Sequence, residues 1–112
     1  MRDLLFIFLL ALGLSAASQA SDLLPPEKWP RTIEQAVVDI LRDMPEDDKQ
    51  RLRDTSSSDL IMFHMGWGMG IRNQFGLWRG NHDLMLSACG RPCHPDDASM
   101  LVIEAVWRAV QR

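Results

Sequence analysis

The side chains that could do chemistry gather in residues 64–81, a stretch that also holds five of the seven glycines. His64 and Arg72 are eight residues apart with Gly68 midway, so on a helix they share one side with no side chain between them. The guanidinium could bind a carboxylate or phosphate through two hydrogen bonds, and the imidazole could donate or accept a proton. The spacing indicates a small polar site, with Asn73 beside it.

The same residues have a structural interpretation, which we favour. Arg72 could pair with an acidic residue of the last helix, because a buried guanidinium needs a partner. His64 would then be a half-buried histidine whose hydrogen bonds are all made.

Asp96 and Asp97 follow Pro95 at the start of the last predicted helix and are the candidate acids. A His–Asp pair would suit acid–base catalysis, although two first-turn acids also complement a helix dipole. No serine stands in a strained strand-to-helix turn, and the cysteines are expected to be paired. The sequence therefore favours binding over catalysis, and it predicts no cofactor.

Cys89 and Cys93 are the only thiols. In an exported protein such a pair is oxidised, and the intervening Gly-Arg-Pro can turn tightly, so we predict a local disulfide. The spacing does not match the C-x-x-C redox motif. His82 and His94 would complete a zinc set, but adjacent Cys93 and His94 suit one tetrahedral ion poorly, so no metal is predicted.

The stretch has the pattern H-x-G-x-G-x-G-I-R-N-x-F-G-L-W-x-G-N, followed by H-P-D-D-A-S and by V-W near the C-terminus. This pattern resembles an uncharacterised bacterial domain-of-unknown-function family, with a match from about Trp29 to Trp107. The resemblance implies no activity. It implies that six residues belong to one structural unit: Arg72, Asn73, Trp78, Asn81, Asp96 and Asp97.

Apolar residues between Ser58 and Asn73 recur at steps of three and four, which predicts one helix ending at Asn73. Gly66, Gly68 and Gly70 lie inside it, although each costs about 1 kcal/mol relative to alanine. Close packing against a bare Gly66–Gly70 face is the explanation we favour. The alternatives are a helix break with positive φ and a ligand against the backbone. A dinucleotide site is excluded, because no strand precedes the glycines.

The first 20 residues have the features of a secretory signal. An apolar core of 11 residues is followed by small residues, with cleavage expected after Ala20. That core is too short for a typical membrane span, so we expect a periplasmic or secreted protein with no span after cleavage. The formal charge of −3 argues against a nucleic-acid partner.

The remaining chain predicts an all-α, compact single domain of about four to five short helices. Residues 21–31 form a proline-rich lead-in pinned by Trp29, and residues 32–112 form the helical domain. Thr32 and Gln35 form a capping-box signature for a helix to Met44. A short surface helix follows, Asn81 caps the next, and the apolar helix from Pro95 should be the most buried.

Three functions remain open. The first is a non-catalytic binding or inhibitory protein of the immunity type, whose partner is another protein of the bacterial envelope. The second is a small-ligand-binding protein or enzyme centred on His64, Arg72 and Asn73. The third is a structural assembly module of the envelope that uses Trp78 and the groove at Gly66 and Gly70 to dock on another helix; an exposed patch of Trp67 and Trp78 would support it. We favour the first because the chain is small and acidic and has no complete catalytic set.

Overall fold

The computed structural model describes residues 23–112, which form five α-helices, two 3-10 helices and no strand. The bounds are η1 Pro26–Lys28, α2 Ile33–Asp43, α3 Glu46–Arg53, η2 Ser57–Phe63, α4 Trp67–Gln74, α5 His82–Cys89 and α6 Pro95–Gln111. The predicted all-α fold is confirmed, whereas the predicted signal, residues 1–20, lies outside the described residues. Between residues 23 and 112 no helix is both long and apolar enough to cross a membrane.

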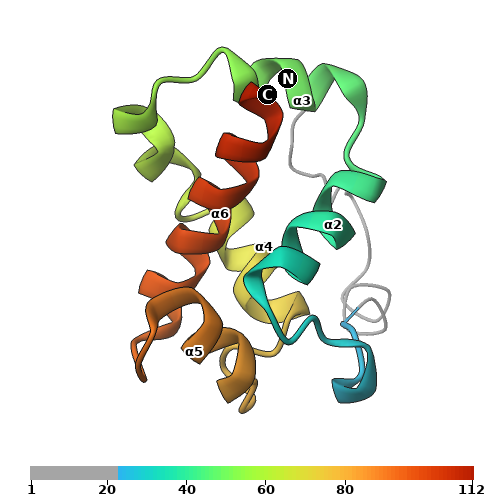
Figure 1. The fold of residues 1–112 in the computed structure, drawn as a ribbon, viewed down its shortest axis with the longest axis vertical. Coiled ribbons are helices and arrows are strands. Elements are labelled where there is room, and N and C mark those ends of the chain that lie inside the picture. The colour runs from blue at the N-terminus through green and yellow to red at the C-terminus, as the bar shows by residue number, and fades with distance from the viewer. Residues whose placement is uncertain (1–22) are drawn as a thin grey trace.

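Helix α6 is the centre of the domain. It runs along the molecule in Figure 1 and contacts each of α2, α3, α4, α5 and η2. Val102, Ile103 and Val106 on this helix have no exposed surface. The prediction that the last helix is the most buried one is confirmed, because a helix that is apolar over most of its circumference is stable only when surrounded.

Two helices begin at the caps that the sequence predicts. Thr32 Oγ1 accepts a hydrogen bond from the Gln35 backbone N–H at 3.1 Å at the start of α2. Asn81 Oδ1 accepts from the Leu84 N–H at 3.2 Å at the start of α5. The Gln35 side chain is directed along the helix, where its Nε2 donates to Asp39 Oδ1 at 2.8 Å, and the reciprocal bond of the capping box, from the Thr32 N–H to Gln35 Oε1, is not formed.

The predicted single helix from Ser58 to Asn73 is wrong. The chain forms η2, turns at residues 64–66 and then begins α4. A three-residue step such as Leu60 to Phe63 fits a 3-10 helix as well as an α-helix, and Gly66 gives the α-helix little support at the junction. Gly66 nonetheless has a negative φ of −92°, so the break does not use left-handed glycine.

The end of α4 also differs from the prediction. The helix passes Asn73 and ends where Gly76 takes a left-handed φ of 72°. The Leu77 N–H then donates to the Arg72 carbonyl at 3.1 Å, the longer hydrogen bond of a Schellman motif. Glycine adopts this conformation at lower cost than asparagine, which is why the stop falls at Gly76.

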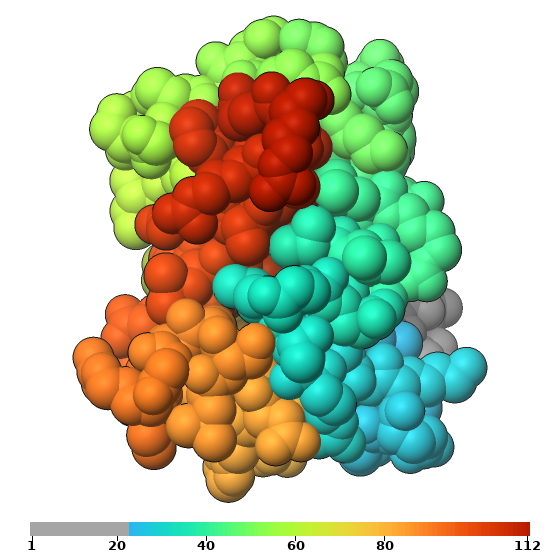
Figure 2. Space-filling view, in the orientation of Figure 1, coloured from blue at the N-terminus to red at the C-terminus, as the bar shows by residue number. Residues whose placement is uncertain are grey.

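The lead-in is fixed to the domain by Trp29, as predicted. This residue is buried, and its indole Nε1 donates to the Leu24 carbonyl at 3.1 Å. A Cβ added at Gly76 would lie 2.2 Å from the Trp29 ring, so only glycine allows the ring to lie there. Figure 2 shows the lead-in against the start of α2 at one corner of the molecule.

Candidate functional site

Arg72 reaches from α4 to the start of α6 and is held there by three protein groups. Its Nη1 donates to Ser99 Oγ at 2.9 Å, its Nη2 donates to the His64 carbonyl at 3.2 Å, and its Nε lies 3.4 Å from Asp96 Oδ1. The side chain is 6% exposed. Arg72 therefore pairs with an acid of the last helix, as the structural interpretation predicts, and that acid is Asp96.

Gly68 makes room for this guanidinium. A Cβ at position 68 would lie 3.1 Å from Arg72 Nη1 and 3.3 Å from the Phe63 carbonyl oxygen. Close packing is therefore the reason for Gly68, which lies midway between His64 and Arg72. The sequence predicts close packing against the face of Gly66 and Gly70. At Gly66 this prediction is wrong, because a Cβ there would meet nothing within 4 Å.

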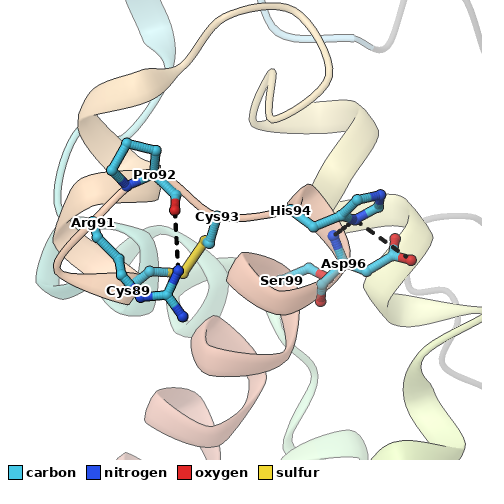
Figure 3. Close-up of a disulfide and its surroundings, with 7 residues drawn as sticks. All are labelled: Cys89, Arg91, Pro92, Cys93, His94, Asp96 and Ser99. Carbon is cyan, nitrogen blue, oxygen red and sulfur yellow. Dashed lines mark hydrogen bonds and ion pairs between the residues drawn. A yellow bond between two sulfur atoms is a disulfide. The ribbon is translucent and has the colours of Figure 1, made fainter.

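Asp96 lies between two histidines at the N-terminus of α6. Its Oδ2 is 3.9 Å from His64 Nε2 and 3.7 Å from His94 Nδ1. Figure 3 shows His94, Asp96 and Ser99 together at the start of this helix, and the Asp96 N–H donates to His94 Nδ1 at 3.0 Å. His94 is thus the N-cap of α6, a role that the sequence did not suggest.

His64 is half-buried, as expected, but its hydrogen bonds are not all made. Its Nδ1 is closed to solvent and has no hydrogen-bond partner among the described residues. A buried polar atom without a partner costs about 1–3 kcal/mol. Among the described residues of this group, His64 is therefore the one with a buried polar atom that lacks a hydrogen-bond partner.

The predicted disulfide is confirmed. Cys89 and Cys93 are joined, with Gly90 in the left-handed conformation between them, and Figure 3 shows the bridge beside His94. The two sulfurs that the zinc alternative required are therefore bonded to each other. Within residues 23–112 no group of three or more His, Cys, Asp or Glu residues could hold a metal ion.

Trp78 extends the group toward the solvent. Its ring meets that of His94 edge to face, with centroids 5.3 Å apart, and the side chain is 56% exposed. Trp67, in contrast, is buried. The two tryptophans therefore do not form the joint exposed patch that would have supported the assembly-module hypothesis, and they are not both buried, which would have counted against it.

Three candidate residues lie outside this group. Asn73 is exposed, and its backbone carbonyl accepts from Arg79 Nη2 at 2.9 Å. Asn81 has no exposed surface, and its Nδ2 donates to the carbonyls of Pro30 and Phe75 at 2.9 and 2.8 Å. Asp97 is exposed on the first turn of α6.

The structure also reveals four apolar side chains that the sequence did not single out. They lie within nine consecutive residues of η2, the turn and α4, and each is 41% to 76% exposed. We call them the methionine surface: Ile61, Met62, Met65 and Met69. They occupy the positions between the buried Leu60, Trp67 and Ile71 and the partly buried Phe63, and that alternation was the signal that could have identified them.

The geometry defines a small all-helical domain with one local disulfide, a buried arginine cluster and an exposed apolar surface beside it. A family model described as a domain of unknown function, DUF6794, matches residues 29–110. Since this match covers most of the chain, the chain belongs to the DUF6794 family. No curated protein and no solved structure matches it.

Proposed function

We propose that this chain is a non-catalytic binding module whose interface is the methionine surface. The observation that carries the proposal is the exposure of Met62, which is 76% accessible beside Ile61, Met65 and Met69. Single exposed apolar side chains are common, but several of them within one short segment suggest a place where another molecule docks. Methionine suits this role because its flexible, polarisable side chain adapts to a partner.

Polar groups beside the methionine surface would fix the orientation of a bound partner. His64 lies within the methionine surface in sequence, and Asp96 and His94 connect it to Trp78 through contacts of 3.9 Å, 3.7 Å and 5.3 Å. Exposed tryptophan is frequent among the residues that dominate binding energy. A hydrogen-bond donor on the partner could also satisfy the Nδ1 of His64 if the ring turned toward it.

The partner we propose is a basic protein of the bacterial envelope. The chain carries a formal charge of −3, and opposite charge speeds association. Export is supported by the signal pattern of residues 1–20 and by the Cys89–Cys93 disulfide, since such bonds persist in oxidising compartments. An inhibitory role of the immunity type is one form that this binding could take.

The alternative of a ligand site or enzyme around His64, Arg72 and Asn73 has less support. The guanidinium of Arg72 is buried and already bonded to Ser99, His64 and Asp96. Asn73 is exposed apart from these residues. An incoming anion would have to displace existing contacts, so the geometry favours Arg72 as a support beneath the binding surface.

Site-specific photo-cross-linking in intact cells tests the proposal. The full chain is expressed with p-benzoylphenylalanine in place of Met62 or, as a matched control, in place of Val38, which is 57% exposed on α2. We expect one discrete adduct in the periplasmic fraction from position 62 and none from position 38. The absence of an adduct from position 62, or the same adduct from both positions, would refute the proposed interface.

A further inference from the structure

A cavity of about 530 Å³ lies on a different part of the domain from the methionine surface. It is formed where the lead-in and η1 face α2 and α4, and it shares no residue with the methionine surface. Its volume falls in the range of small-molecule sites, about 300–1,000 Å³. A cavity of this size suits a compact ligand better than a docked helix or a second domain.

The floor and the rim of the cavity differ in chemistry. Three aromatic rings, of Trp29, Trp67 and Phe75, line it together with Ile40 and Ile71. These five side chains are all buried. The charged lining residues are three carboxylates and two cations, Glu27, Asp39, Asp43, Lys28 and Arg42. Because this rim is nearly balanced and Arg42 is paired with Asp39, it favours a ligand without net charge.

Gly70 gives the cavity part of its width. It lies within α4, between Trp67 and Ile71 in the same wall, and it contributes no side chain there. Glycine in a helix interior is less stable than alanine, so its presence calls for a reason. Gly68 is explained by its close contact with Arg72, whereas Gly70 lines the cavity. The space beside Gly70 is therefore the candidate position for a ligand.

Trp67 provides an unpaired hydrogen-bond donor in the same wall. Its indole Nε1 is buried, and no described residue accepts from it. Because this N–H is closed to solvent in the present ring position, a ligand oxygen would reach it only after a small rotation of the ring. Such a bond would remove the penalty of leaving a buried donor unpaired.

We propose that this cavity binds an uncharged aromatic or similarly apolar small molecule that carries one hydrogen-bond acceptor, such as a carbonyl. The rings of Trp29, Trp67 and Phe75 would cover its apolar body, and Trp67 Nε1 would donate to its oxygen. The site is independent of the proposed protein interface, so the failure of either proposal leaves the other standing.

Fluorescence titration of the purified protein with prodan tests the proposal. Prodan is an uncharged naphthalene with a ketone oxygen, and its emission shifts to the blue in apolar surroundings. We expect saturable binding with one site per chain. The Gly70→Leu variant should lose at least tenfold in affinity, because the new side chain fills the cavity. It should remain folded in thermal unfolding, since leucine is the better helix former.

Two further variants separate this site from general stickiness or misfolding. Gly66→Ala adds a side chain to the same stretch where nothing lies within 4 Å, and it should bind prodan like the wild type. Trp67→Phe removes the N–H. The ratio of prodan to naphthalene affinity should then fall about fivefold, because a net hydrogen bond is worth about 1 kcal/mol.

Two results would overturn the proposal. One is prodan binding that does not saturate or that is unchanged by Gly70→Leu. The other is a wild-type protein that elutes as a dimer and loses prodan as its concentration rises, since a second copy would then cover the cavity. An unchanged prodan-to-naphthalene ratio in Trp67→Phe would contradict the assigned hydrogen bond.

Discussion

The contact between the lead-in and the end of α4 differs sharply from the stretch between Ile61 and Met69. In the first region Trp29 is buried against Gly76, and both its indole N–H and the amide of Asn81 have acceptors. In the second region four apolar side chains are exposed, and His64 Nδ1 lacks a partner. The polar groups at the lead-in contact are therefore bonded within the chain, whereas the stretch from 61 to 69 leaves apolar side chains exposed and a buried imidazole nitrogen without a partner.

Under the proposed function, this contrast separates residues that stabilise the fold from residues that would bind a partner. A buried and fully bonded group contributes to the free energy of unfolding, and its loss is felt in stability. An exposed apolar group contributes little to the free energy of unfolding, and its loss lowers the affinity for a partner only where that partner covers it. Substitutions in the two regions should therefore produce effects of different kinds.

The largest effect is expected at Gly76. Gly76→Ala forces a non-glycine residue into a left-handed conformation, which costs about 1–2 kcal/mol. It also drives a methyl group into the Trp29 ring, and overpacking adds about 1–3 kcal/mol. Urea unfolding should show the combined loss. Gly80→Ala is the control, because its φ of 99° is also left-handed but a Cβ there has open space; an equal loss at both positions would remove Trp29 from the explanation.

A smaller but still large loss is expected at Asn81. Asn81→Ala removes two hydrogen bonds to buried carbonyls and the cap of α5, which should lower the free energy of unfolding by about 2–4 kcal/mol. Asn81→Ser keeps a capping oxygen and should recover about 1 kcal/mol of that loss. If both variants unfold like the wild type, the lead-in region is not the well-bonded region described above.

The disulfide should contribute less. It closes a loop between residues only four apart in sequence, so in the chain-entropy account its removal costs about 2 kcal/mol. The double variant Cys89→Ser/Cys93→Ser should therefore remain folded in circular dichroism and unfold at lower urea. A variant that is unfolded without urea would show that the disulfide stabilises the whole domain and not only the turn between α5 and α6.

The sequence was sufficient to predict the features that depend on residues close together in the chain. The caps at Thr32 and Asn81, the burial of α6 and the Cys89–Cys93 pair all follow from side chains within a few residues of one another. The pairing of Arg72 with an acid of the last helix could also be predicted. The choice of Asp96 over Asp97 could not, because it depends on where α6 lies relative to α4.

The errors fall where tertiary contacts decide between similar local choices. One apolar spacing fits both an α-helix and the observed η2 followed by α4, so the break at residues 64–66 was not predictable from it. The left-handed residue after α4 is Gly76 instead of Asn73, and the second reason for glycine there, the Trp29 ring in the space of its Cβ, comes from 47 positions earlier in the chain. The cavity was not predictable either, since three separate segments form it.

The most direct test of the central claim combines stability and binding in one variant. The double variant Met62→Asp/Met65→Asp places two charges on the methionine surface, and a matched Val38→Asp variant charges an exposed apolar position on α2. We expect both proteins to unfold within about 0.5 kcal/mol of the wild type. Only the double variant should fail to capture the partner identified by cross-linking at position 62. A double variant that still captures that partner, or that loses its stability instead, would contradict the assignment of this surface to binding.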